Sequence, residues 1–165
     1  GLALSGIELA DDSLTVGALT LHSEVAAGNE ISSLSNLALA IGDAQVRNRG
    51  TIGGSIANSD PGADYPAAVL ALGATINTTA GAIDADDFFQ GLFETALKPG
   101  AIVTSVTFPL PVRAAYEKFP NPASRYAVVG VMVAETNGGV RVGVTGAGPC
   151  AYRQRNFEQA LADNF

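Results

Sequence analysis

The sequence is poor in the residues that most often mark metal centres and disulfides. Its 165 residues include one cysteine, Cys150, one histidine, His22, and no tryptophan. A single cysteine excludes an internal disulfide and any Cys-ligated iron–sulfur cluster built by this chain alone, and it fits a reducing, cytoplasmic setting. No HExxH or CxxC spacing is present, so the sequence supports no protein-only metal site.

Positive charge is scarce as well. Nine Lys and Arg stand against 16 Asp and Glu, which gives a formal net charge of −7 and a pI near 4.5. A nucleic-acid partner is not expected, because binding phosphates needs a basic face. No apolar run approaches the roughly 20 residues of a membrane-spanning helix, so no transmembrane segment is expected. The chain begins at Gly1 and its one methionine, Met132, is internal, which favours a fragment of a longer protein.

The composition favours an ordered α+β fold. Hydrophobic residues make up 47% and charged residues 15%, with 19 glycines, so a buried core with many turns is expected. Thr20 is a candidate N-cap of a first helix, and Gly73 is a candidate C-terminal stop of a later one. The Asn137-Gly138 pair between two apolar runs predicts a β-hairpin. Helices are predicted over 21–27, 31–41, 66–72, 84–89 and from 157 onward, and strands over 13–18, 74–78, 101–108, 126–135 and 140–146.

The stretch from Gln45 to Pro66 carries the candidate chemistry. It is rich in Gly, Asn, Ser, Asp and Pro, which predicts a long ordered loop. Within it, TIGGS pairs two glycines, which tolerate a close backbone approach, with two hydroxyl side chains, so its amides could form an anion-binding nest. Arg47 and Arg49 lie just upstream, and Asn58, Asp60 and Asp64 could accept from a bound cofactor. Taken alone, the motif fits a plain turn better, and it is neither a Walker loop nor a Rossmann fingerprint.

Three longer segments, which follow one another along the chain, indicate a family far more specifically than the TIGGS motif alone. The segment VRNRGTIGGSIANSDPGADYPAAVLALGATI, then FFQGLFETALKPGAIVTSVTFPLP, then KFPNPASRYAVVGVMVA span nearly the whole chain. They resemble the FAD subunits of molybdenum hydroxylases. The Ala-Ser-Arg-Tyr-Ala sequence is most similar to the medium subunits of aerobic carbon monoxide dehydrogenases.

The resemblance implies a fold and a division of the chain. Residues 1–110 correspond to the second subdomain of a vanillyl-alcohol-oxidase/PCMH-type FAD-binding domain, incomplete at its N-terminus. Residues 111–165 correspond to the start of an α+β C-terminal domain, and Pro109-Leu110-Pro111 is the candidate boundary. The other flavin segment of the family, an Ala-Gly-Gly run, is absent from the chain.

The resemblance also assigns a set of cofactor contacts and no catalytic residue. Asp64 is expected at the adenosine or ribose end of FAD, and Lys118 and Tyr126 beside the isoalloxazine ring. The full set carried over is Gly50, Thr51, Ile52, Gly53, Gly54, Ser55, Asn58, Asp64, Val103, Thr104, Lys118 and Tyr126.

Several side chains keep a plainer interpretation. Lys118 could be a solvated surface charge. Tyr126 could be a half-buried strand residue. His22 is expected to be structural or exposed, Arg125 pairs equally well with a carboxylate, and Cys150 is expected to be an inert small hydrophobe.

The implied function is electron transfer within a hetero-oligomer. FAD would sit on this subunit, with the molybdenum cofactor on a large partner subunit and [2Fe–2S] clusters on a small one. Electrons would pass from the clusters to FAD and on to an external acceptor, in the cytoplasm or at the inner face of the membrane. The alternatives are an FAD subunit of a xanthine or nicotinate dehydrogenase-type enzyme, a self-contained flavin oxidase, and a non-catalytic assembly piece.

Overall fold

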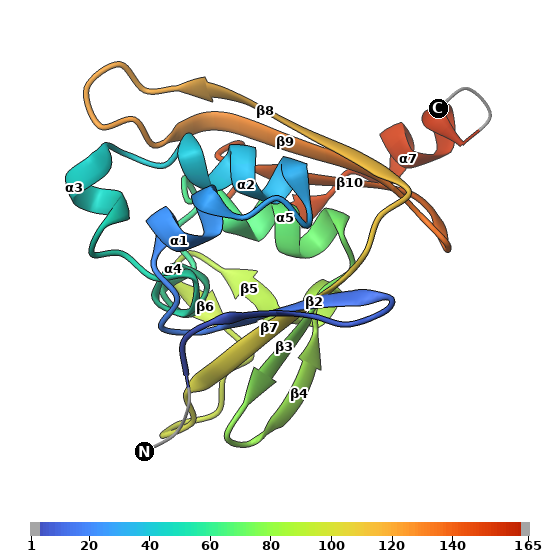
Figure 1. The fold of residues 1–165 in the computed structure, drawn as a ribbon. Coiled ribbons are helices and arrows are strands. Elements are labelled where there is room, and N and C mark those ends of the chain that lie inside the picture. Colours follow the sequence, from blue (N-terminus) through green and yellow to red (C-terminus); the bar gives the residue numbers. More distant parts are fainter. Residues whose placement is uncertain (1–3, 163–165) are drawn as a thin grey trace.

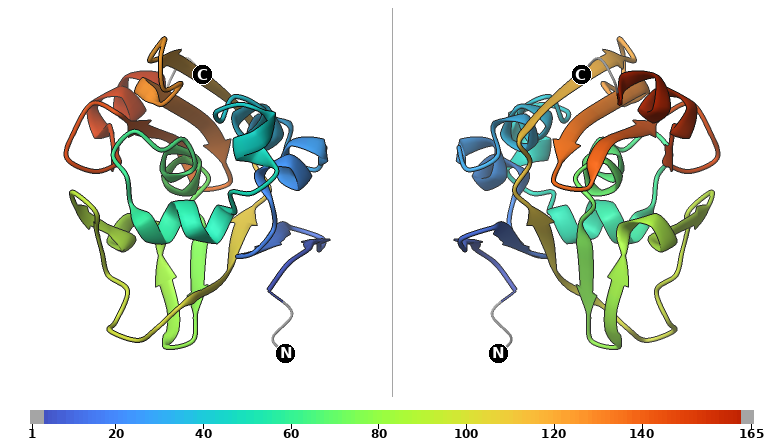
Figure 2. Two further views of the ribbon diagram at one scale, coloured as in Figure 1. Left: turned by 90° about the vertical axis from the view of Figure 1, so that its left-hand side faces the viewer. Right: turned by 90° about the vertical axis from the view of Figure 1, so that its right-hand side faces the viewer.

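The structure, a computed structural model, describes residues 4–162 and has three layers (Figure 1). Two antiparallel sheets form the outer layers, one of five strands in the order β1-β2-β7-β3-β4 and one of four in the order β11-β10-β9-β8. Helices lie between them, as the two side views in Figure 2 also show. This is the α+β architecture that the composition predicts.

The strands follow the β-branched and alternating runs of the sequence. Thr136 pairs with Gly139 across a two-residue Asn137-Gly138 loop, and Gly139 has φ of 104°, so the predicted hairpin is confirmed. The five-stranded sheet contains β1 Ile7–Leu9, β2 Ser13–Gly17, β3 Thr75–Thr78, β4 Gly81–Asp84 and β7 Val103–Pro109. The four-stranded sheet contains β8 Arg113–Pro120, β9 Ala127–Thr136, β10 Gly139–Thr145 and β11 Tyr152–Arg153, and a separate ribbon contains β5 Phe89–Gly91 and β6 Glu94–Thr95.

Helix α5, Tyr65–Ala71, lies at the centre of the molecule. All seven of its residues are buried, with Pro66 in the first turn and Gly73 beyond the end at φ of 64°, as its sequence predicts. The other helices are α1 His22–Ala27, α2 Ser32–Leu39, α3 Ala44–Arg47, α4 Ile52–Asn58, α6 Ala85–Phe88 and α7 Arg155–Leu161. Gly143 of β10 lets that strand approach α5 closely, because a Cβ there would collide with the carbonyl oxygen of Ala67.

One hydrophobic core joins the layers. It includes Ile76 and Phe108 from the five-stranded sheet and Met132 and Ala134 from the four-stranded sheet. The division of the chain at residue 110 stays a prediction, and the core includes side chains from both sides of it.

Two expectations about local structure are wrong. The stretch from Gln45 to Pro66 is not a loop, since it contains α4, most of α3 and the start of α5. Thr20 does not cap α1, because its hydroxyl donates to the carbonyl of Gly6 (3.0 Å), and the Glu24 carboxylate accepts from the Leu21 amide instead. Strands β1, β4, β5, β6, β8 and β11 were not predicted.

Candidate functional site

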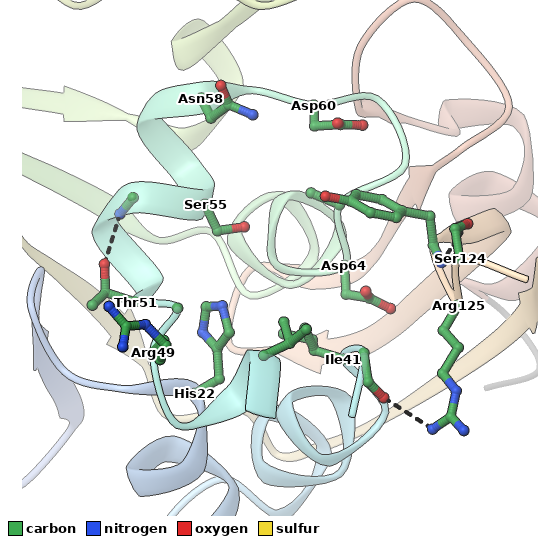
Figure 3. A pocket seen from close by; sticks show the side chains of 16 residues that line it. His22, Ile41, Arg49, Thr51, Ser55, Asn58, Asp60, Asp64, Ser124 and Arg125 are labelled. Atoms are coloured by element: carbon green, nitrogen blue, oxygen red, sulfur yellow. Dashed lines mark hydrogen bonds between the residues drawn. The ribbon is translucent and has the colours of Figure 1, made fainter. Parts of the chain in front are cut away.

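A cavity of about 570 Å³ opens beside α4 (Figure 3). This volume lies in the range of roughly 300–1,000 Å³ that is common for small-molecule sites. Its walls come from four places that are distant in sequence: the start of α1, the region around α3, the stretch from Arg49 to Asp64, and the β8–β9 connection at 124–126.

The structure gathers seven of the twelve predicted cofactor residues around this cavity. They are Gly50, Thr51, Gly54, Ser55, Asn58, Asp64 and Tyr126. The other five, Ile52, Gly53, Val103, Thr104 and Lys118, do not line it. Ile52 and Val103 are buried in the core, and the carbonyl of Thr104 accepts from the Ala18 amide (2.9 Å). For these residues, contact with a cofactor stays a prediction.

The local sequence explains how α4 presents its polar side. Thr51 is the N-cap, and its Oγ1 accepts from the Gly54 amide (3.2 Å). Ile52 and Ile56, one helical turn apart, are fully buried and fix the helix against the core. Ser55 and Asn58 therefore remain on the side that faces the cavity (Figure 3).

The predicted backbone nest is wrong for this structure. The amide of Ile52 donates to the Thr20 carbonyl (3.2 Å), and that of Gly53 donates to the Ala18 carbonyl (2.9 Å). The Gly54 amide is taken by the Thr51 hydroxyl, and the Ser55 amide by the Thr51 carbonyl (3.0 Å). Gly53 serves packing here, because a Cβ on it would lie 2.4 Å from that of Ala18.

Side chains, rather than amides, supply the donors of the cavity. In the part of the chain that the structure describes, no hydrogen bond is recorded for the side chains of Arg49, Ser55 or Asn58, which line one wall. A guanidinium, a hydroxyl and a carboxamide together suit the oxygens of a phosphate or a sugar. These residues fit a phosphate-bearing cofactor such as FAD through side-chain contacts.

Asp64, on the floor of the cavity, already has two partners. Tyr116 donates to its carboxylate (2.6 Å), and Lys118 forms an ion pair with it (2.9 Å); the Asp64 and Lys118 side chains are only 5% and 6% exposed. Burial raises the pKa of the Asp64 carboxyl, and the hydrogen bonds from Tyr116 and Lys118 oppose that shift. Lys118 is therefore not the solvated surface charge that the plainer interpretation describes.

The opposite wall is formed by the β8–β9 connection. Arg125 has φ of 61°, and its guanidinium donates a hydrogen bond to the carbonyl of Gly42 (3.2 Å). Tyr126 is 51% exposed and lies just before β9, so it is not a strand residue. Arg125 and Arg49 bring positive charge to opposite sides of the cavity (Figure 3).

His22 is a cavity residue that the sequence did not indicate. It is only 6% exposed, and its ring packs on that of Tyr65 with the centroids 5.3 Å apart. Desolvation by burial lowers its pKa from 6.5 to about 4, so the imidazole is neutral at pH 7. The one sequence feature that could have pointed to His22 is its place at the start of a predicted helix. In the structure its amide donates to the Gly50 carbonyl (3.0 Å).

Comparison with known proteins gives this arrangement a family. Residues 1–111 match the model of a family described as "FAD binding domain in molybdopterin dehydrogenase". The chain belongs to this family. Its fold is accordingly that of the PCMH-type FAD-binding domain, and the cofactor that the family binds is FAD.

Relatives within the molybdopterin dehydrogenase family agree on the subunit. The chain is 33% identical over 147 residues to the carbon monoxide dehydrogenase medium chain of Afipia carboxidovorans, covering 82% of this chain and 51% of that one. It is 34% identical to the glyceraldehyde dehydrogenase medium chain of Sulfolobus acidocaldarius, covering 79% and 50%. A crystal structure of the cyanide-inactivated Cu,Mo-CO dehydrogenase superposes with a TM-score of 0.88 at 30% identity, covering 96% and 61%. The chain thus spans about half to three fifths of the length of the proteins it matches.

Other candidate features of the chain are plain in the structure. Cys150 is partly buried, with its Sγ 3.9 Å from the Phe89 carbonyl oxygen. Among residues 4–162 no group of His, Cys, Asp and Glu is arranged to hold a metal ion. None of the helices in the same range is long and apolar enough to cross a membrane.

Proposed function

We propose that the cavity beside α4 binds FAD and that the chain is part of an electron-transfer subunit of a carbon monoxide dehydrogenase-like complex. The observation that carries the proposal is the set of unengaged donor side chains of Arg49, Ser55 and Asn58 on one wall of a cavity of suitable size. Family membership supports FAD as the ligand.

The residues of the chain bind and orient the cofactor. Arg49 and Arg125 offset the repulsion that a chain of net charge −7 exerts on phosphate. Ser55 and Asn58 donate hydrogen bonds to its oxygens, and the exposed ring of Tyr126 covers it from the opposite side. The bound flavin supplies the redox chemistry, and the protein positions it.

The proposed partners are a large subunit with the molybdenum cofactor and a small subunit with [2Fe–2S] clusters, in a hetero-oligomer in the cytoplasm or at the inner face of the membrane. The relatives support this assembly, because two of them are named medium chains of dehydrogenases. Their names also differ in substrate, so a xanthine- or nicotinate-type dehydrogenase is the second candidate. A non-catalytic assembly piece is the third.

Flavin binding is tested by paired substitutions at Gly54 in the full-length subunit. Gly54 is exposed at the third position of α4, where an acidic side chain suits the helix start. Gly54→Asp therefore keeps the fold but places a negative charge at the proposed phosphate contacts. We expect at least about a tenfold loss of FAD affinity, measured by quenching of flavin fluorescence.

The matched control is Gly54→Asn, which has nearly the same size and no charge. It should lose far less affinity than the aspartate variant. Equal affinity of the Gly54→Asp variant and the unsubstituted subunit would refute the site. Subunits that co-purify with this one, analysed for molybdenum and iron, distinguish the electron-transfer complex from an assembly piece.

A further inference from the structure

Tyr116 and Lys118 are neighbours on the inner face of β8. They lie two residues apart in the strand, so their side chains leave it on the same side. Tyr116 pairs in register with Met132 of β9, which is fully buried in the core, and Lys118 pairs with Gly130. A hydroxyl and an ammonium group are thereby brought to one carboxylate, that of Asp64 at the start of α5.

The four-stranded sheet makes room for the hydroxyl of Tyr116. A Cβ on Gly130 would collide with Tyr116 Oη, so glycine at this position of β9 lets the ring extend across the sheet. The hydroxyl donates to Asp64 Oδ1 at 2.6 Å, a distance typical of a strong hydrogen bond to an ionised carboxylate. Tyr116 is therefore packed to make this contact.

The Asp64 carboxylate retains acceptor capacity toward the cavity. Oδ1 is engaged by Tyr116 and lies 2.9 Å from Lys118 Nζ, whereas Oδ2 accepts from Lys118 (3.1 Å), and no second side chain is recorded on it within residues 4–162. A carboxylate has about two acceptor positions on each oxygen, so Oδ2 can accept from a further donor. Asp64 lines the cavity, and Figure 3 shows its carboxylate pointing toward the space between Ile41 and Arg125.

We propose that Tyr116 is a positioning residue for the flavin dinucleotide: its hydroxyl holds Asp64 so that Oδ2 accepts a hydrogen bond from a hydroxyl group of the ligand. The inference rests on the proposed function and goes beyond it, because Tyr116 does not itself line the cavity. Lys118 holds the same carboxylate and is anchored in turn to the carbonyl of Ala40 (3.0 Å). A fixed carboxylate attracts hydroxyl donors and repels phosphate, so it selects which part of the ligand lies beside it.

Tyr116→Phe in the full-length subunit tests the role, since it removes the hydroxyl and keeps the ring. We expect FAD to bind about three- to tenfold more weakly, measured by quenching of flavin fluorescence, with the fold checked by circular dichroism. The matched control is Tyr152→Phe, which removes a hydroxyl from β11 at a position that does not line the cavity and should leave the Kd unchanged. An unchanged Kd in Tyr116→Phe overturns the inference alone, whereas no flavin binding by the unsubstituted subunit overturns the proposed function with it.

A double-variant cycle shows whether Tyr116 acts through Asp64. In an Asp64→Asn background the carboxylate is already absent, so adding Tyr116→Phe should change the FAD Kd by less than about twofold. If Tyr116→Phe weakens FAD binding equally in both backgrounds, its hydroxyl does not act through Asp64 and the inference is wrong.

The pH dependence of FAD affinity separates positioning from packing. Burial raises the pKa of the Asp64 carboxyl and the hydrogen bond from Tyr116 opposes that rise, so losing the hydroxyl raises the pKa further. As the pH falls, Tyr116→Phe should therefore lose FAD affinity at a higher pH than the unsubstituted subunit. Superimposable pH profiles would contradict the proposal. The other titratable and charged groups around Asp64 are the same in both proteins: Lys118, Tyr65, His22, Arg49, Asp60 and Arg125.

Discussion

Gly53 and Gly54 are neighbours in α4 but face different surroundings. A Cβ on Gly53 would lie 2.4 Å from the Cβ of Ala18 and 2.8 Å from its backbone, which cannot move aside easily. A Cβ on Gly54 would meet only the Thr51 hydroxyl, at 3.0 Å, and the position is exposed. We predict that Gly53→Ala lowers the free energy of unfolding by about 1–3 kcal/mol, because overpacking forces backbone shifts.

Gly54→Ala is the matched control in the same urea-unfolding measurement. Alanine has a higher helix propensity than glycine, so this variant should be unchanged or more stable by up to about 1 kcal/mol. Equal destabilisation by the two alanines would mean that α4 does not pack against Ala18 as described.

His22 also predicts a pH dependence of stability. Its pKa falls from 6.5 when exposed to about 4 in the folded chain, so the unfolded state binds more protons between these values. Stability is therefore retained above pH 6.5 and falls as the pH drops toward 4, by about 2 kcal/mol after allowance for solvent screening. Denaturant unfolding at a series of pH values measures the slope.

His22→Gln provides the reference for that slope. Carboxylates titrate near the lower end of the window in both proteins, so the difference between the two curves isolates the imidazole. Parallel curves from pH 6.5 to pH 4 would show that His22 is not desolvated in the folded state.

At the scale of elements, the Lys118–Asp64 pair connects three of them. Lys118 of β8 binds the carboxylate at the start of α5 and also donates to the carbonyl of Ala40 at the end of α2 (3.0 Å). Lys118→Met leaves a buried carboxylate without its cation, for which we predict a loss of about 3–5 kcal/mol in the free energy of unfolding.

The double variant with Asp64→Asn tests the cause. Removing the carboxylate charge as well should restore part of the lost stability, because asparagine still bonds Tyr116 without a counter-ion. If the double variant lost as much stability as the two single variants together, the pair would not be coupled. The flavin affinity of Asp64→Asn measures in addition whether Asp64 has the cofactor contact predicted for it.

The elements that the sequence predicts are those with a local cause. The hairpin at Asn137-Gly138 and the end of α5 at Gly73 each need a positive φ that glycine supplies nearby. Helix α4 was missed because its glycines and polar residues suit a loop, although Ile52 and Ile56 lie at helical spacing. Strand β8 was missed because it is an edge strand whose exposed residues alternate with only partly buried ones.

The site was predicted in the same uneven way. The residues around Ser55 were predicted from the resemblance of their segment to the family sequence. The partners of Asp64 and the position of His22 depend instead on contacts between distant segments. Lys118 is 54 residues from Asp64 in the chain, and no local pattern encodes that pairing. Tertiary contacts of this kind become visible only when the layers are assembled.

For the whole molecule, the decisive feature is the central position of α5. The helix is buried between the two sheets, and Gly143 of β10 touches it so closely that no side chain fits between. Met132 and Ala134 of β9 belong to the same core as Ile76 and Phe108. The two parts that the sequence divides at residue 110 therefore share one interior.

That shared interior predicts the outcome of a truncation. A polypeptide of residues 1–110 lacks β8 to β11, so one side of α5 would be exposed to water at a cost of roughly 25 cal/mol per Å² of apolar surface. We expect it to show no cooperative thermal transition and to bind a hydrophobic dye, whereas the 165-residue chain melts in one step when followed by circular dichroism. A cooperative transition of 1–110 alone would instead support two independent domains. In that case the α5–β10 contact would be an interface between folded units, and the cavity wall at 124–126 could move relative to α4 while the flavin enters.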